Sequence, residues 1–377
     1  MSLEVRPVRS RADLMRFIRL PWRIHRSHER WIPPLIWERK QFLDKKKNPY
    51  FEHAEADYFI AWRGTDPVGR ITAMVDRQFN DYHDWKWGTF GFFECLDDPE
   101  AAKALVDTAD AWVRERGCDR LVGPMDFTMN DEVGILIEGF DLRPMLKQPW
   151  HPPYYQGLME GAAGLTKAQD LLMWNLEVSD RSSVLPIIDE LAEQVEPKHG
   201  IQIRHMRKKD MEAEVRRFVE VYNAAWSKNW GFVPISEAEM KQTAKDMKLI
   251  IDEDWLWVAE TKEGETVGVA LTIPDFNQAI EKANGRLLPF GWAKMLWQKR
   301  KIDRVRVGFL GVKPEYQHTG VAAKFYVEHF ETASWKPQDG GEMGWILESN
   351  DAMNRGMEAM GGRVVKKYRL YERVFPA

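Results

Sequence analysis

The segment from Val305 to Ala333 constrains the fold of this chain more than any other, because it joins three local signals in one run. It begins as an apolar strand, passes through a turn at 317–322 (QHTGVA) and continues as an amphipathic helix. The small residues Gly320 and Ala322 let the backbone of the turn approach a ligand closely. A helix beginning there offers unpaired N–H groups and the positive end of its dipole to an anion. The pattern predicts a binding site for a pyrophosphate group.

Further elements on both sides of this segment indicate an α/β domain. Upstream, Trp255 to Ile273 reads as two alternating apolar strands joined by a Gly-containing turn, which predicts a hairpin. Downstream, a short strand over Met343–Leu347 precedes a helix over Asn350–Met360. Gly361 ends that helix, and a last strand follows over Arg363–Val374.

The turn and its flanking elements resemble the GNAT (GCN5-related) acyl-CoA N-acyltransferases. Their signature is Arg or Gln, two residues, Gly, one residue, then Gly or Ala at a strand-to-helix turn, and Gln317, Gly320 and Ala322 match it. The resemblance implies an α/β (α+β) fold with mixed, mostly antiparallel sheets flanked by helices, and acetyl-CoA or another acyl-CoA as co-substrate. The residues that it assigns to CoA are Leu310, Gly311, Val312, Gln317, His318, Thr319, Gly320, Val321, Ala322, Asn350 and Asn354. The alternative is an unrelated α/β domain in which Gly320 only tightens a turn.

The chain of 377 residues is longer than one such domain and contains a weak internal repeat. Arg6–Asp13 and Arg204–Asp210 open similar segments, and Asp57–Asp76 parallels Asp254–Asp275, each with an apolar strand, a charged Gly turn and a Val-Gly pair. We therefore expect two tandem GNAT-like domains, a degenerate one over 1–178 and an acyl-CoA-binding one over 179–377.

The first repeat differs from the second at the turn. Its strand Thr89–Leu96 and helix Pro99–Gly117 take the places of the CoA strand and helix, but Asp97, Asp98 and Glu100 lie between or next to them. Charge repulsion and bulk argue against a pyrophosphate at this turn. We expect the first repeat to build part of the substrate site or to brace the second domain.

Composition excludes several classes of protein. A net charge of -4 and a pI near 6.2 do not favour nucleic-acid binding. The two cysteines, Cys95 and Cys118, form no CxxC or Cys/His cluster, so we expect neither a disulfide framework nor a metal site. The N-terminus has no apolar signal core and no run is long enough to span a bilayer, which predicts a cytoplasmic protein.

Two segments exceed a minimal GNAT domain. Asn277–Lys301 is amphipathic and has a basic end. It forms either a helix and loop packed on the domain or a lid over a long acyl chain. A third alternative is that residues 285–301 form a patch that touches an anionic membrane. Its basic residues also suit the phosphates of CoA. Gly123–Tyr155 is a long loop that either forms turns or holds the acceptor amine. The polar residues of this loop are Asp126, Asn130, Asp131, Glu132, His151, Tyr154 and Tyr155.

N-acyl transfer requires a base for the amine, a donor to the oxyanion and a proton for the leaving thiolate. The resemblance implies that a backbone N–H around Leu310–Val312 meets the oxyanion and that a Tyr in the last helix is the acid, but that position is Met357 here. The candidates to replace it are Tyr368 or Tyr371, and Tyr154 or Tyr155. Glu348, at the end of a strand, is the favoured base, with His318 and His151 as weaker candidates. We therefore predict Glu348, Tyr368 and Tyr154 as the catalytic residues.

The leading functional hypothesis is transfer of an acyl group from acyl-CoA to an amine of a small molecule or lipid precursor. Tandem GNAT proteins include relatives that act on amino acids and, in some bacterial lineages, on long-chain amino alcohols of lipid synthesis. Met357 also permits a non-catalytic acyl-CoA sensor. An aminoacyl or peptidyl transferase that uses charged tRNA is disfavoured by the intact CoA turn, and a protein acetylase by the bulky insertion.

Overall fold

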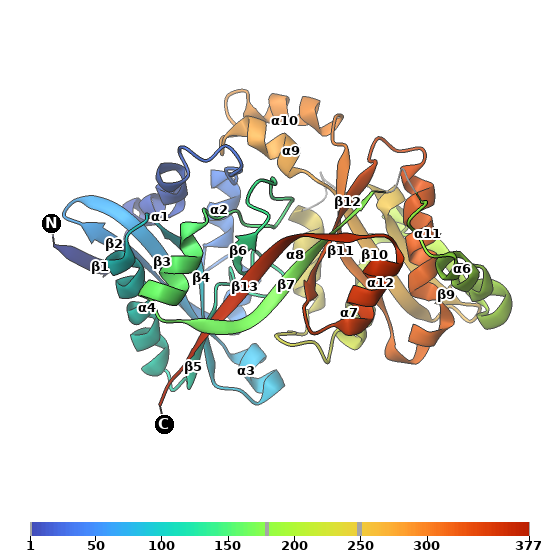
Figure 1. Ribbon diagram of the computed structural model, residues 1–377, viewed down its shortest axis with the longest axis horizontal. Helices are drawn as coiled ribbons and strands as arrows, with labels where there is room; N and C mark the ends of the chain where they lie inside the picture. The colour runs from blue at the N-terminus through green and yellow to red at the C-terminus, as the bar shows by residue number, and fades with distance from the viewer. Residues whose placement is uncertain (1, 178–180, 247–250, 377) are drawn as a thin grey trace. The chain divides into compact units, whose positions relative to one another are not determined.

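The computed structural model describes residues 2–177, 181–246 and 251–376, which form two compact units (Figure 1). The first unit comprises Met1–Leu171, Ala279–Leu296 and Lys366–Ala377, and the second comprises Leu172–Gln278 and Trp297–Val365. The predicted boundary between residues 178 and 179 lies outside the described residues. The last strand and most of the 277–301 insertion, which the repeat placed in the second domain, belong to the first unit.

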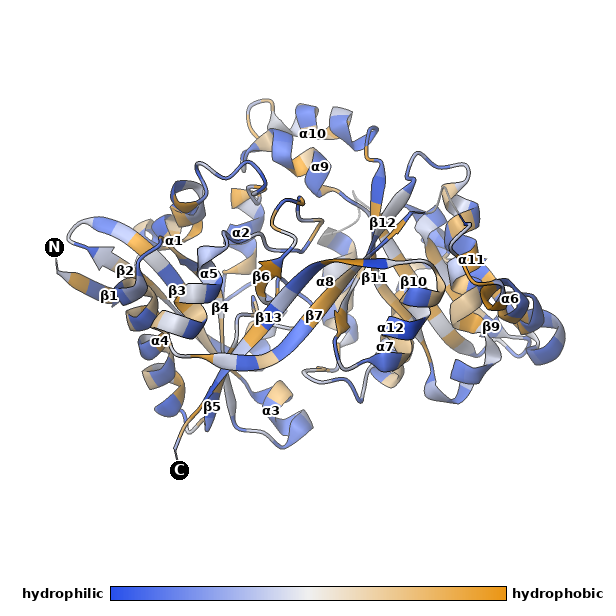
Figure 2. Ribbon diagram, viewed as in Figure 1, coloured by the Kyte–Doolittle hydropathy of each residue, from blue (hydrophilic) through white to orange (hydrophobic). Residues whose placement is uncertain are grey.

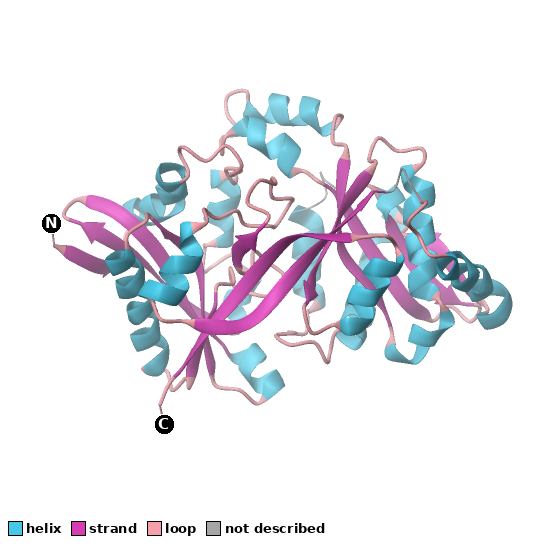
Figure 3. Ribbon diagram, in the orientation of Figure 1, coloured by secondary structure: helices cyan, strands magenta, loops and turns pink. Residues whose placement is uncertain are grey.

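The first unit is built on a mixed sheet with the strand order β1-β2-β3-β4-β5-β13, and β6 pairs with β13 (Figure 3). Its strands are β1 (Leu3–Pro7), β2 (Ala54–Arg63), β3 (Asp66–Asp76), β4 (Trp87–Cys95), β5 (Arg120–Gly123), β6 (Ile135–Glu138) and most of β13 (Arg363–Val374). Its helices are α1 (Arg11–Ile24), α2 (Ile36–Phe42), α3 (Arg77–His83), α4 (Pro99–Arg114) and α5 (Tyr154–Gly157). The sequence reasoning missed β6, which Figure 2 shows as hydrophobic, because it lies inside the long loop after β5.

The second unit has the strand order β7-β12-β11-β10-β9-β8. Its strands are the end of β7 (Thr166–Glu177), β8 (Ile201–His205), β9 (Leu256–Thr261), β10 (Thr266–Pro274), β11 (Arg304–Val312) and β12 (Gly340–Leu347). Its helices are α6 (Pro186–His199), α7 (Met211–Ala225), α8 (Glu237–Asp246), α11 (Val321–Ala333) and α12 (Asp351–Ala359), and α9 (Asn277–Ile280) and α10 (Gly291–Lys299) form the insertion. The predicted hairpin and the predicted strand, turn and helix are therefore confirmed.

Both sheets are covered on both faces, and the alternation of side chains along a strand explains how. In the first unit Tyr58 and Ile60 of β2 pack with α1, whereas Phe59 and Ala61 pack with α4. The second unit follows the same scheme. Leu256 and Val258 of β9 pack with α7, whereas Trp257 and Ala259 pack in the core that contains α11. A strand buried on both faces reads as a continuous apolar run, as these strands do.

Each unit contains one parallel strand pair that ends early. In the second unit β11 pairs with β12 up to Val307 and Met343, and β11 then runs on to Val312. In the first unit β4 pairs with β5 up to Thr89 and Val122, and β4 then runs on to Cys95. The two strands of each pair thus diverge at corresponding places, which agrees with the tandem repeat, and Leu310–Val312 lie beyond the parallel pairing with β12.

Candidate active site

A buried polar cluster in the first unit is centred on Glu94, which lies on β4 beyond the last pair with β5. Its Oε2 accepts a hydrogen bond from the hydroxyl of Tyr155 at 2.6 Å and lies 2.7 Å from Nε2 of His25. A guanidinium nitrogen of Arg70 lies 3.9 Å from its Oε1. Residues from β3, β4, α5 and the C-terminal cap of α1 therefore meet at one carboxylate.

A bulge in β4 directs Glu94 toward His25. Phe90 and Phe93 both lie in the core on the α4 side, so the alternation of side chains shifts by one between them. The intervening Phe92 has a φ of 50°, and its N–H donates to Oδ1 of Asp126 at 2.6 Å. A side chain on Gly91 would meet the carbonyl oxygen of Met125 at 2.1 Å, so only glycine lets the chain after β5 cross β4 this closely.

Charges around Glu94 keep it ionised. Burial by itself would raise the pKa of this carboxyl, but electrostatic attraction to His25 and the hydrogen bond with its Nε2, together with Arg70 and His151, lower the pKa to about 2. Burial lowers the pKa of His151 to about 4 and raises the pKa of Tyr155. At neutral pH the cluster thus contains a carboxylate, a neutral His151 and a protonated phenol.

His25 is 2% exposed and lies between aromatic rings. It stacks on Trp31 with ring centroids 4.9 Å apart, and the ring of Tyr155 lies at 6.5 Å. Nε2 is held by Glu94, whereas Nδ1 has no hydrogen-bond partner among residues 2–177, 181–246 and 251–376. Buried ring nitrogens are normally paired, so this free position points to a ligand or a transferred proton.

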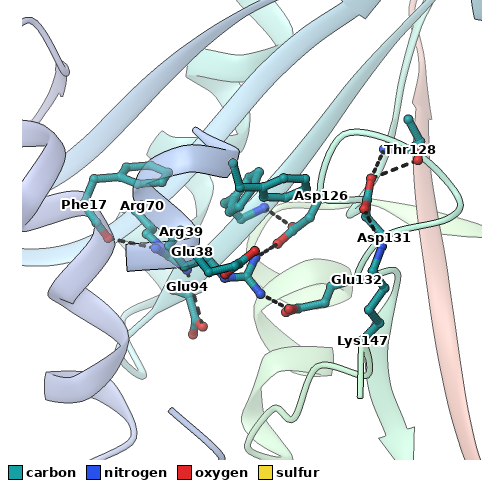
Figure 4. A network of polar contacts seen from close by, with 12 residues as sticks. Phe17, Glu38, Arg39, Arg70, Glu94, Asp126, Thr128, Asp131, Glu132 and Lys147 are labelled. Carbon is teal, nitrogen blue, oxygen red and sulfur yellow. Dashed lines mark hydrogen bonds and ion pairs between the residues drawn. The ribbon is translucent and has the colours of Figure 1, made fainter. Parts of the chain in front are cut away.

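A second charged group adjoins the first (Figure 4). Arg39 of α2 donates to Glu132, lies 3.7 Å from Oδ2 of Asp126 and pairs with Glu38. Burial and the neighbouring Glu132 raise the pKa of Asp126. Nearby, Asp131 caps the turn at Thr128 and pairs with Lys147. Asp126 and Glu132, predicted either to form turns or to hold an amine, therefore line the Glu94 region, whereas Asp131 has a turn role.

The predicted CoA turn lies in the second unit. Gly320 has a φ of 83° and precedes α11, while Gln317 and His318 are exposed and Thr319 and Val321 are buried. Gln317 donates to the carbonyl oxygen of Val312 at 3.4 Å. A Cβ on Gly320 would lie 2.7 Å from the carbonyl oxygen of Leu191, so the element that approaches this glycine closely is α6.

The other residues assigned to CoA have structural contacts. Gly311 of β11 faces Trp226, whose ring would lie 2.2 Å from an added Cβ. Asn350 caps α12 by accepting from the N–H of Met353 at 3.2 Å. Asn354 donates to the carbonyl oxygen of Leu347 and accepts from the indole of Trp174. Leu310 and Val312 are buried, and Ala322 is half-buried.

In the first unit, the N-terminus of α4 corresponds to the N-terminus of α11 in the second unit, and it carries the carboxylate of Asp98. Asp98 caps α4 by accepting from the N–H of Ala101 at 3.1 Å. Arg63 pairs with Asp98 through two contacts, at 2.6 and 2.9 Å, and also with Glu100 at 2.6 Å. The N–H of Ala101 at this terminus is therefore already paired with a carboxylate of the chain.

The three predicted catalytic residues are divided between the units. Glu348 is exposed after β12 in the second unit, and Met357 is fully buried in α12. Tyr154 and Tyr368 belong to the first unit, where their hydroxyls donate to the carbonyl oxygens of Cys95 and Pro149. The sequence reasoning missed His25, Glu94 and Arg70, which lie far apart in the chain and match no motif.

The part of the chain that the structure describes contains no group of three or more His, Cys, Asp or Glu side chains that could hold a metal ion. Among the same residues, every helix is too short or too polar to cross a bilayer.

Comparisons with known proteins place this chain in a family. It is 37% identical to "Bacterial ceramide synthase" of Caulobacter vibrioides (strain NA1000 / CB15N) over 99% of this chain and 97% of the relative, and 34% identical to "Protein YghO" of Escherichia coli (strain K12) over 98% and 95%. No family model matches. Among solved structures, a tandem GNAT protein from the clavulanic acid biosynthesis pathway aligns over all of both chains with a TM-score of 0.56 at 11% identity, which shows the fold. The chain therefore belongs to the family of the C. vibrioides bacterial ceramide synthase and E. coli Protein YghO, which has the tandem GNAT fold.

Proposed function

We propose that this protein transfers an acyl group from acyl-CoA to the amine of a lipid-like acceptor, with His25 as the base and Glu94 as the residue that positions it. The observation that carries this proposal is the free Nδ1 of a buried imidazole whose Nε2 is held by an ionised carboxylate. Such a pair accepts a proton at one nitrogen while the carboxylate stabilises the resulting imidazolium.

The proposed reaction moves two protons. The ammonium group of the acceptor gives the first to Nδ1 of His25, and the free amine attacks the thioester carbonyl. A C–N bond forms and the C–S bond breaks. The amine nitrogen loses its second proton, the thiolate of CoA takes up one proton and leaves as a thiol, and the other proton is released to solvent. Tyr155, whose hydroxyl bonds Glu94 and accepts from the N–H of Cys95, fixes the carboxylate during these steps.

A lipid-like acceptor is favoured by two facts. A relative that is 37% identical along the chain is named a bacterial ceramide synthase. The candidate base is enclosed by Trp31, Trp150 and Tyr155, and aromatic rings favour an acceptor with an apolar body beside its amine.

We retain the turn at 317–322 as the proposed phosphate site of acyl-CoA. Substitutions at Gly320 would displace α6, so the exposed Gln317 and His318 are better probes. Q317E/H318E is expected to weaken acyl-CoA binding about tenfold, because two carboxylates would repel the phosphates. Isothermal titration with acyl-CoA measures this, and E315Q, which removes a charge on the same turn, is the control. Unchanged affinity in Q317E/H318E would place the phosphates elsewhere.

The function itself is tested by incubating the purified protein with acyl-CoA and a long-chain amino alcohol while free thiol and amide are quantified. We expect equal amounts of thiol and amide, and more product with long-chain than with short-chain amines. Binding of acyl-CoA without transfer to any amine would instead support the acyl-CoA sensor that Met357 permits.

A further inference from the structure

The segment around α10 exposes large apolar side chains close together in the chain. Their exposed fractions range from 48% to 77%. They form what we call the α10 patch, which consists of Leu288, Phe290, Trp292, Leu296 and Trp297. Met295, on the same helix, is buried and anchors α10 to the protein. The helix itself is labelled in Figure 1. Five such side chains in one short segment are unusual for a surface that meets only water.

The charge of this segment has one sign. Residues 286–301 (RLLPFGWAKMLWQKRK) contain no Asp or Glu, although the whole chain has a net charge of -4. The basic side chains of the segment are exposed, and they are Arg286, Lys294, Lys299, Arg300 and Lys301. Nζ of Lys301 lies 3.7 Å from the ring centre of Trp297, so charge and aromatic surface are adjacent.

We propose that the α10 patch docks on the surface of an anionic lipid bilayer. Trp, Phe and Leu side chains enter the boundary between headgroups and acyl chains, while Lys and Arg attract anionic headgroups. A segment with only positive charges beside apolar side chains complements both the headgroups and the acyl layer of such a surface.

The residues just before the patch in the chain are connected to the candidate base by contacts within the first unit. The ring of Trp22 packs on Gly285, lying 2.4 Å from the position of a Cβ there, and its indole donates to Asn284 at 3.3 Å. Trp22 meets Trp31 edge to face at 5.3 Å, and Trp31 stacks on His25. On the proposed function, docking at 288–297 brings a bilayer-borne amine close to the residue that deprotonates it.

The test is flotation of the full chain with vesicles of equal parts phosphatidylcholine and phosphatidylglycerol, or of phosphatidylcholine alone. We expect the protein to float with the anionic vesicles, less with neutral ones, and less again as salt is raised. F290E/W292E is expected to lower the bound fraction at least about tenfold, because two aromatic side chains that would enter the bilayer are replaced by carboxylates that the anionic headgroups repel. W335E changes an equally exposed tryptophan outside the patch and should bind like the wild type.

Three results would overturn the proposal. The wild-type protein does not float with anionic vesicles, or F290E/W292E floats as well as the wild type does. In the third, light scattering shows that the wild type self-associates and that F290E/W292E has lost only this self-association, which would make the patch an interface between copies of the chain. Its failure is separable from that of the proposed function. With a short-chain, water-soluble amine, F290E/W292E should keep its activity and H25Q should lose it, whereas H25Q should still float with vesicles.

Discussion

H25Q is expected to lower kcat/KM for acyl transfer at least about a hundredfold, the usual contribution of a general base. The amide nitrogen of glutamine can take the place of Nε2 and donate to Glu94, so the partner of the carboxylate is kept while the basic Nδ1 is lost. Steady-state kinetics with acyl-CoA and a long-chain amine measure the effect. The KM for acyl-CoA should change little, because His25 is not in the proposed phosphate site.

Two matched substitutions make this result specific. H28Q changes a second imidazole just after α1, whose ring centroid lies 5.9 Å from that of His25, and should leave the rate within about threefold of wild type. E348Q removes the base that the sequence favoured, and should likewise have a small effect. A large loss in E348Q together with a nearly active H25Q would move the base to the second unit.

E94Q is expected to lower the free energy of unfolding at pH 7 by about 3 kcal/mol, in addition to impairing catalysis. The pKa of Glu94 is about 2 in the folded protein against an ordinary value of 4.5. A carboxyl with a lowered pKa stabilises the fold fully above pH 4.5, and this stabilisation is lost as the pH falls through 4.5 toward 2. Removing the carboxylate also leaves the buried guanidinium of Arg70 without this counter-charge, and Nε2 of His25 without its charged partner.

Urea unfolding at pH 7 and near pH 3 measures both parts of this prediction. The free energy of unfolding should fall more in the wild type than in E94Q when the pH is lowered from 7 to 3, since the variant has no carboxyl at this position to protonate. E100Q removes an exposed carboxylate that pairs with Arg63 and should stay within about 0.5 kcal/mol of wild type at pH 7. Equal acid sensitivity of wild type and E94Q would show that Glu94 is not held as an ion in the folded protein.

The tandem GNAT fold could be predicted from the sequence because its signals are local. The alternating apolar residues of β9 and β10, the Gly320 turn before α11, and Gly361 after α12 each specify a strand, a turn or a helix end within a few residues. The internal repeat then extended the fold prediction from the C-terminal half of the chain to the N-terminal half. The acidic character of the turn in the first half could also be recognised from the sequence, because Asp98 caps the helix that directly follows it in the chain.

The candidate active site was decided by tertiary structure. Glu94 meets His25 and Tyr155 only because a bulge at Phe92 changes the face to which β4 directs its side chains. A shift of one residue leaves no mark in the pattern of a strand that is buried on both faces along its whole length. Contacts between residues 61 or 69 positions apart follow from packing rather than spacing. The sequence by itself determined the elements and their order, whereas the folded sheet determined which charges meet in the interior, because burial and proximity exist only after the chain has packed.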